Sequence, residues 1–181
     1  MRNRVKSKLL QVIAAFCALL AGPNLTAEGT NAILARHLND LVVVQGSGFA
    51  SFKPDAWLKA RYIVIYFGAG WCPDCRHFSP SLVAAYDHQP ADRERFEVLL
   101  LPMDRTEAEQ LKFMRAEKMS WPALGFDKMA SATDLRKYHS GKGIPWLSII
   151  DSEGQVVLQS KNDQDAAQVL RGLEDLVKRK N

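Results

Sequence analysis

Apolar runs and amphipathic stretches alternate along most of the chain. The segment Tyr62–Phe67 is apolar at every position, which is typical of a central strand covered by helices on both faces. Phe96–Leu101 has the same character and predicts a second buried strand. Between Asp163 and Lys178 a helix is predicted, because apolar residues recur on one helical stripe formed by Ala166, Val169, Leu170, Leu173, Leu176 and Val177.

The remaining elements are shorter. Asp151–Gly154 is a turn signal that joins two expected strands, Leu147–Ile150 and Gln155–Leu158, as an antiparallel hairpin. Asp104 and Glu107 have the spacing of a capping box at the start of a helix. We also expect strands over Leu41–Val44 and Phe49–Phe52, and helices over Pro54–Ala60, Cys72–Gln89 and Thr133–Tyr138. The prediction is an α/β fold with a central mixed β-sheet flanked by helices.

The N-terminal segment has the three parts of a signal peptide. Basic residues alone carry charge in residues 1–8, the apolar run Leu9–Ala21 follows, and a small-residue site ends at Ala27. The run is shorter than the roughly 18 residues that cross a bilayer, which favours cleavage after Ala27 over a permanent anchor. We therefore predict a signal peptide over residues 1–27 and one domain over residues 28–181, with the membrane contacted only during export.

Composition narrows the possible partners. The 181 residues are 47% hydrophobic and 24% charged, as expected for one globular core. The full chain has 24 Lys plus Arg and 20 Asp plus Glu. Removing residues 1–27 removes four basic residues and no acidic ones, which leaves 20 of each sign. The apparent basicity is a targeting feature, so no nucleic-acid partner is expected.

Two of the three cysteines remain after cleavage. Cys72 and Cys75 lie between a buried strand and a helix, the context in which CxxC is typical of a redox dithiol. Unpaired N–H groups at the helix start favour a thiolate at Cys72 and make it the candidate nucleophile. Cys75, one turn further along, is the candidate resolving thiol.

The neighbours of the cysteines tune this site. Pro73 suits the first turn of a helix, while the charge of Asp74 opposes a thiolate and Arg76 is the nearest compensating cation. An inert disulfide and half of a zinc site are the alternatives. Zinc would need two further ligands, and only His77 is near in sequence, so no metal site is predicted.

These residues resemble a known family. The stretch Tyr66–Arg76 (YFGAGWCPDCR), followed by Phe78, Pro80 and Leu82, is similar to the active-site segment of the thioredoxin superfamily, specifically its tryparedoxin and nucleoredoxin-like branch. The resemblance continues through Asp104–Glu107, Met119–Leu124 and Gly143–Pro145. It implies a thioredoxin-like fold with Cys72 exposed and Cys75 buried.

The resemblance also implies a substrate groove. A cis peptide is expected at Ile144-Pro145, opposite the cysteines, where the main chain would pair with an extended substrate and Trp71 would add apolar surface. Tyr66 stands where thioredoxin has a buried aspartate for proton transfer. Trp146 follows Pro145 where a small hydroxyl residue is more usual, which predicts a narrower or more apolar groove.

The combined hypothesis is an exported, periplasmic or secreted thiol–disulfide oxidoreductase. We expect a monomer without a cofactor that reduces disulfide-bearing protein substrates and takes electrons from a membrane or periplasmic thiol donor. The alternatives are a non-catalytic binding module of the same fold, a disulfide oxidase and an isomerase.

Overall fold

The computed structural model describes residues 32–54, 60–89, 96–162 and 165–178. The predicted signal peptide lies outside the described residues, and so do residues 55–59 of the helix expected over Pro54–Ala60. Within the described ranges, no helix has the length and apolar character needed to cross a membrane.

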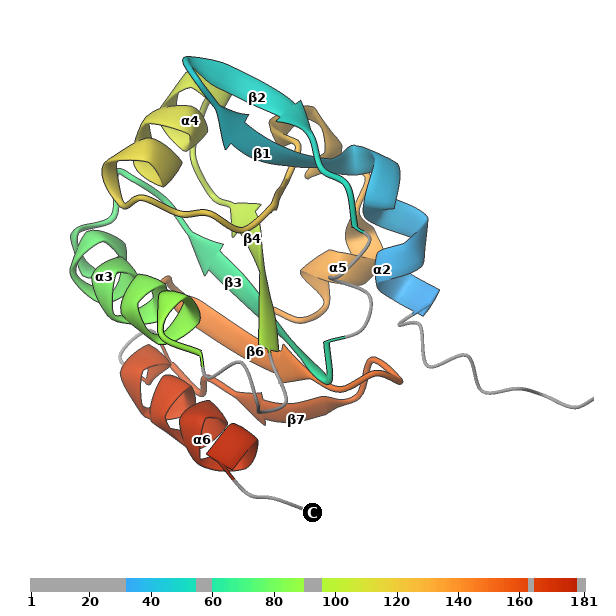
Figure 1. Cartoon of the computed structure of the whole chain (residues 1–181), viewed down its shortest axis with the longest axis vertical. Helices are drawn as coiled ribbons and strands as arrows, with labels where there is room; N and C mark the ends of the chain where they lie inside the picture. Colours follow the sequence, from blue (N-terminus) through green and yellow to red (C-terminus); the bar gives the residue numbers. More distant parts are fainter. Residues whose placement is uncertain (1–31, 55–59, 90–95, 163–164, 179–181) are drawn as a thin grey trace, which may run out of the picture.

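The elements follow one another in an order that closely matches the expected one (Figure 1). They are α2 (Ala32–His37), the 3-10 turn η1 (Leu38–Asp40), β1 (Leu41–Gln45), β2 (Gly48–Ser51), β3 (Tyr62–Gly68), α3 (Pro73–Asp87), β4 (Phe96–Pro102), α4 (Glu107–Ala116), β5 (Ala123–Leu124), the 3-10 turn η3 (Phe126–Lys128), α5 (Thr133–Arg136), β6 (Trp146–Ile150), β7 (Val156–Gln159) and α6 (Ala166–Lys178).

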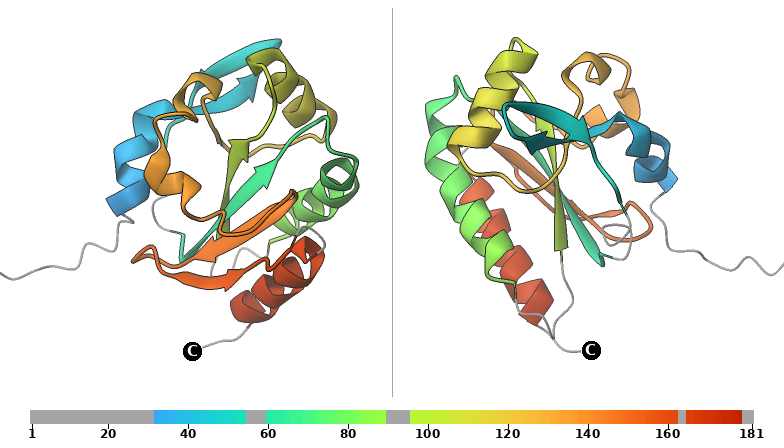
Figure 2. Two further views of the ribbon diagram at one scale, coloured as in Figure 1. Left: turned by 180° about the vertical axis from the view of Figure 1, so that it is seen from behind. Right: turned by 45° about the horizontal axis from the view of Figure 1, so that its top comes forward.

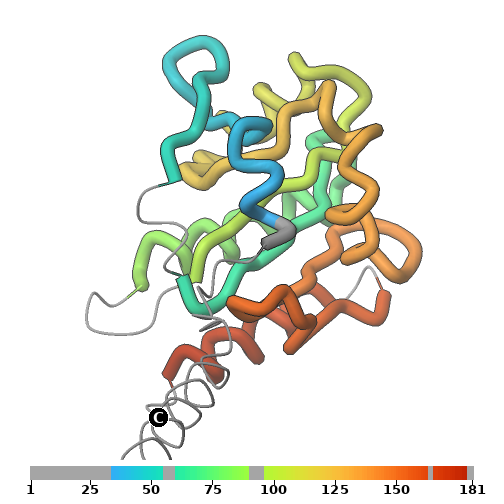
Figure 3. The backbone as a smooth tube through the Cα atoms, turned by 90° about the vertical axis from the view of Figure 1, so that its right-hand side faces the viewer, coloured from blue at the N-terminus to red at the C-terminus, as the bar shows by residue number. Residues whose placement is uncertain are grey.

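The strands form one mixed sheet in the order β2-β1-β5-β4-β3-β6-β7. The pairs β3–β4 and β4–β5 are parallel, and the other neighbours are antiparallel. Hairpins β1–β2 and β6–β7 therefore occupy the two opposite edges, as Figure 3 shows. The mixed sheet and the antiparallel hairpin predicted across Asp151–Gly154 are confirmed.

Strand β3 is buried along its whole length because helices cover both faces of the sheet. Its alternate side chains Tyr62, Val64 and Tyr66 join the core under α3 and α6, while Ile63, Ile65 and Phe67 join the core on the α2 and α5 side. Figure 2 shows α3 and α6 together on one face, with α2 and α5 on the other. The β3 side chains thus form part of both cores.

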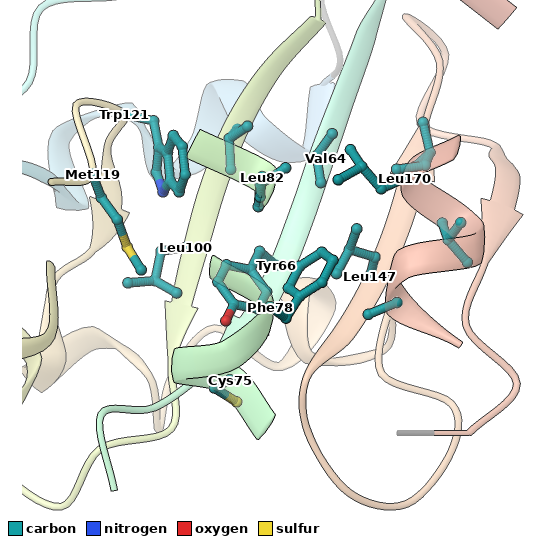
Figure 4. Packing of buried hydrophobic residues seen from close by; sticks show 14 of the residues in the cluster. Val64, Tyr66, Cys75, Phe78, Leu82, Leu100, Met119, Trp121, Leu147 and Leu170 are labelled. Carbon is teal, nitrogen blue, oxygen red and sulfur yellow. The ribbon is translucent and has the colours of Figure 1, made fainter. Parts of the chain in front are cut away.

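The predicted apolar stripe of the last helix packs on the sheet. Four of its residues are buried in α6, and Leu176 and Val177 pack partly buried against the same core. Helix α6 also contacts α3, and Figure 4 shows Leu170 of α6 among the buried side chains of this core. The C-terminal helix therefore supports the face on which α3 lies.

The capping box predicted at Asp104 and Glu107 is wrong by two residues. Thr106 is the N-cap of α4, and its hydroxyl accepts a hydrogen bond from the N–H of Glu109 at 3.1 Å. Glu109 in turn accepts one from the N–H of Arg105 at 2.9 Å. Asp104 precedes the cap and turns instead toward the loop after β3, where it accepts a hydrogen bond from Gly70.

A polar cluster of Arg36, His37 and Asp134 links α2 to α5 on the side of the sheet where Ile63, Ile65 and Phe67 are buried. Asp134 accepts hydrogen bonds from Arg36 at 2.9 Å and pairs with the ring of His37 at 2.9 Å. Burial acts to raise the pKa of Asp134, but the hydrogen bonds of Arg36 and His37 outweigh it and lower the pKa to about 2. The ionised carboxylate therefore stabilises the folded state.

We predict that Asp134→Asn lowers the free energy of unfolding at pH 7 by about 1 to 2 kcal/mol. Because the pKa of Asp134 is depressed by folding, its contribution is present above pH 4 and is lost as the pH falls toward about 2. Urea denaturation over this pH range measures both effects. Asp127→Asn, at an exposed carboxylate paired with exposed Lys128, is the control and should change little. An equal loss in both variants would contradict the prediction.

Candidate active site

The CxxC pair lies at the junction between β3 and α3. Strand β3 ends at Gly68, and Cys72 is the N-cap of α3, with extended backbone and with its sulfur accepting a hydrogen bond from the N–H of Cys75 at 3.3 Å. Pro73 occupies the first helical turn, where a missing N–H costs nothing. The predicted strand–turn–helix context of the two cysteines is confirmed.

Both sulfurs are free thiols and both cysteines are buried, with 5% of Cys72 and none of Cys75 exposed. The expectation of an exposed Cys72 is therefore wrong. Its sulfur is covered because it lies against the loop before β6, where the thiol donates a hydrogen bond to the carbonyl of Ile144 at 3.4 Å. The Ile144-Pro145 peptide is cis, as predicted. A substrate sulfur thus has only a narrow approach to Cys72.

Trp71 stands beside this approach and is 49% exposed. Its indole N–H donates to the carbonyl of Met103 at 2.9 Å, and the guanidinium of Arg105 lies 5.8 Å from the ring centre. The ring is therefore held in place although half of it faces solvent. Trp146, by contrast, is 1% exposed in the core on the α5 side and donates to the carbonyl of Tyr138 at 3.0 Å. It packs rather than lining the groove, so the expectation that it narrows the groove is wrong.

The charged neighbours of the cysteines are separated from one another. Arg76 donates to the carbonyl of Gly70 at 2.6 Å. Asp74 is exposed, and in the described part of the chain it forms no ion pair with Arg76. The cation predicted to compensate Asp74 thus binds the turn before the cysteines instead.

Beneath Cys75, a hydroxyl network takes the place of a charged group. The Ser79 hydroxyl donates its proton to the carbonyl of Cys75 at 2.8 Å. In the contact of 3.0 Å between the Tyr66 and Ser79 hydroxyls, Tyr66 is therefore the donor and Ser79 the acceptor. Figure 4 shows the Tyr66 hydroxyl directed toward the end of α3 that carries Cys75. Tyr66 is fully buried, and burial raises its pKa well above the ordinary value.

Burial also raises the pKa of the Cys75 thiol, and its hydrogen bond with Cys72 raises it further. A backbone hydrogen bond at Ala69 acts in the opposite direction and lowers the pKa of Cys75, and so does the nearby hydroxyl of Tyr66 when it is turned to donate to the sulfur. Burial thus favours the thiol form of Cys75, and Tyr66 is a buried side chain whose hydroxyl lies within reach of it.

Asp104 belongs to the site although its role there was not foreseen. Its Oδ1 accepts a hydrogen bond from the N–H of Gly70 at 2.8 Å, while its Oδ2 is buried and without a partner among the described residues. Arg76 holds the carbonyl of the same glycine. The signal in the sequence was its position, since Asp104 follows β4 just as Gly70 follows the parallel neighbour β3.

No group of three His, Cys, Asp or Glu side chains in the described ranges is arranged to hold a metal ion. His77 is exposed on α3. The other histidines bind within the protein: His139 lies 2.8 Å from the carbonyl of Gly143, and His88 lies 2.8 Å from the carbonyl of Ala84.

The buried carboxylate of Asp104 gives a test of how the turn is held. Burial raises the pKa of Asp104, so its charge costs stability, and stability falls as the pH rises through the raised pKa. We predict that Asp104→Asn, which removes the charge and keeps an acceptor for Gly70, is at least as stable as the parent at pH 7. Asp104→Ala should be less stable than Asp104→Asn by about 1 kcal/mol, because it leaves the Gly70 N–H unpaired.

Thermal unfolding at pH 4 and pH 7 measures both effects. The gain of the Asn variant over the parent should be larger at pH 7, where the parent carries the charge. A larger gain at pH 4, or equal stability of the Asn and Ala variants, would show that Asp104 does not act in this way.

Curated relatives are similar to more than half of the chain. Nucleoredoxin from Xenopus laevis is 32% identical over 117 residues, which are 65% of this chain and 27% of that protein. Probable nucleoredoxin 3 from Oryza sativa subsp. japonica is 38% identical over 104 residues, 57% of this chain and 21% of that protein. The chain therefore spans about a quarter of the length of the curated relatives that it matches.

Solved structures share the fold. Tryparedoxin II from C. fasciculata aligns with a TM-score of 0.60 and 26% identity, covering 81% of this chain and 90% of the other. Tryparedoxin from Trypanosoma brucei aligns with a TM-score of 0.57 and 28% identity, covering 80% and 92%. These similarities confirm the predicted thioredoxin-like fold and the predicted branch.

A family model described as thioredoxin-like matches residues 60–156, which include both cysteines and the cis proline. The chain belongs to the thioredoxin-like family of thiol–disulfide oxidoreductases, in its tryparedoxin and nucleoredoxin-like branch.

Proposed function

We propose that the protein reduces disulfide bonds of protein substrates, with Cys72 as the attacking thiolate and Cys75 as the resolving thiol. The observation that carries this proposal is the position of the Cys72 sulfur. Cys72 is the N-cap residue of α3, and its sulfur accepts a hydrogen bond from the N–H of Cys75 at 3.3 Å. The N–H donors at a helix N-terminus stabilise negative charge on such a sulfur.

The reaction consists of two exchanges. The Cys72 thiolate attacks one substrate sulfur, a Cys72–substrate disulfide forms, and the other substrate sulfur leaves as a thiolate that takes up a proton. Cys75 then loses its proton and attacks the sulfur of Cys72. The Cys72–Cys75 disulfide forms, the second substrate thiol leaves, and two electrons have passed to the substrate.

The buried pair Tyr66 and Cys75 supports the second exchange. Because burial raises the pKa of Cys75, this thiol stays protonated while Cys72 acts first. When Cys75 loses its proton, the Tyr66 hydroxyl can donate to the thiolate instead of to Ser79. The tyrosine thus supplies a hydrogen bond to the anion without placing a second charge in the core.

An extended substrate would pair with the main chain of Ile144 beside cis-Pro145 and rest against the exposed face of Trp71. The contact of 3.4 Å between the Cys72 sulfur and the Ile144 carbonyl supports this placement, because a strand added there brings its own sulfur to Cys72. Pro73, Asp74 and Arg76 then tune the site through the helix start and the turn at Gly70.

Two features favour reduction over oxidation. The charge of Asp74 next to Cys72 opposes a thiolate, which makes the disulfide less oxidising. The second is the similarity to tryparedoxins, one of which has been solved as tryparedoxin II complexed with glutathionylspermidine. We propose that a membrane or periplasmic thiol donor returns this protein to the dithiol form.

The proposal also includes export of the protein from the cytoplasm. The basic start, short apolar run and small-residue site predict cleavage after Ala27 and a single domain over residues 28–181. A periplasmic or secreted location would place the CxxC among proteins whose disulfides persist.

Substitution of each cysteine separates their roles. Cys72→Ser should abolish reduction of a model protein disulfide, because the first exchange has no nucleophile. Cys75→Ser should accumulate disulfides between Cys72 and its substrates, which acid trapping and non-reducing electrophoresis detect. Asp127→Asn, at an exposed carboxylate paired with Lys128 and outside the site, is a control and should leave the rate unchanged. Full activity of Cys72→Ser would overturn the assignment.

The direction of electron flow is tested by the reduction potential of the Cys72–Cys75 couple. We expect a value close to that of a reductant of the thioredoxin type, about −270 mV. A value near that of the oxidant DsbA, about −120 mV, would show that the protein is an oxidase instead. Equilibration with glutathione or dithiothreitol buffers, followed by thiol counting, gives this value.

A further inference from the structure

A groove of about 280 Å³ lies directly beside the cis proline, on the side of the cysteines that faces α6. The first two turns of α3 provide Asp74 and His77, the loop before β6 provides Pro145, and the first turn of α6 provides Ala166 and Ala167. Figures 1 and 2 show α3 and α6 side by side. Two of the three elements that build the groove, α3 and the loop before β6, also hold the cysteine pair.

The charged lining of this groove is negative. Asp74 is the one Asp, Glu, Lys or Arg in its lining, it is exposed, and no described side chain forms an ion pair with it. Asp165, immediately before Ala166, is outside the lining, and its carboxylate accepts a hydrogen bond from the N–H of Lys161 at 3.2 Å. His77 is the other titratable group in the lining. The floor is apolar or neutral, so the groove suits an aliphatic stem that ends in a cation.

The position of the groove connects it to the substrate. A client sulfur must come to Cys72, which lies 3.4 Å from the carbonyl of Ile144. An extended chain advances about 3.3 Å per residue. A segment lying along the cis-proline loop therefore brings the side chain one or two residues from its cysteine to Pro145 and the groove.

We propose that this groove selects client segments with a Lys or Arg one or two residues from the disulfide cysteine, and that Asp74 determines this specificity. The proposal rests on the proposed function and names its substrate class. Asp74 acts at the surface, where one ion pair changes a rate only a few-fold.

The test compares pairs of disulfide-bearing peptides that differ only by Lys or Glu at one position, scanned over two residues on each side of the cysteine. The second-order rate constant for reduction is measured in single turnover at pH 8, where imidazole side chains in general carry little charge. Because both peptides meet the same Cys72, their rate ratio cancels any effect of Asp74 on the thiolate itself.

At one or two positions the parent should reduce the Lys peptide about three- to tenfold faster than the Glu peptide. The ratio should fall toward one in Asp74→Asn, invert in Asp74→Lys, and shrink in high salt. Asp87→Asn, which removes an exposed carboxylate at the far end of the same helix, should keep the parent ratio.

A parent ratio of one at every position, or a ratio unchanged in Asp74→Asn, would overturn the groove proposal while reduction itself continued. Failure of the parent and of Asp87→Asn to reduce any peptide would instead overturn the proposed function. The two failures are therefore distinguishable in one set of measurements.

Discussion

The parallel pairing of β3 with β4 is the constraint on which the site depends. The two strands are in register from Tyr62 opposite Phe96 to Gly68 opposite Pro102, so their carboxyl ends lie side by side. The loops that follow them are thereby brought together. Met103 donates its N–H to the carbonyl of Gly68 at 2.9 Å, and Asp104 holds the N–H of Gly70. The position of the turn that carries Trp71 and Cys72 therefore depends on the pairing of β3 with β4 rather than on side chains that contact the sulfur.

The same pairing explains why the cysteines differ. Helix α3 begins where β3 ends, so Cys72 sits at the free N–H groups of the helix, whereas Cys75 faces the core one turn later. Burial then raises the pKa of Cys75, and the Tyr66 and Ser79 hydroxyls supply polar partners beneath it. Two chemically identical side chains three residues apart thus lie in different surroundings, one at the start of the helix and the other facing the core. The proposed order of reaction, in which the sulfur at the helix start acts first, rests on this difference in position.

One buried carboxylate at the site lowers the stability of the folded protein, and a second carboxylate on the opposite face of the sheet raises it. Asp104 is buried with one oxygen unpaired, and burial raises its pKa, so its charge opposes folding while its other oxygen holds the active turn. On the opposite face of the sheet, Asp134 is stabilised by Arg36 and His37 and links α2 to α5. Asp104 and Arg76, near the cysteines, hold the turn at Gly70. The cluster of Arg36, His37 and Asp134, remote from the cysteines, stabilises the fold.

The sequence by itself determined the buried strands, the hairpin at Asp151, the stripe of α6 and the identity of the CxxC, because each depends on local periodicity or on adjacent residues. Pairing across the sheet decided the rest. The turn of Asp104 toward Gly70, the burial of Trp146 away from the groove and the covering of Cys72 by Ile144 each join segments more than thirty residues apart. Such contacts depend on where strands lie in the sheet, and local sequence patterns do not encode that placement.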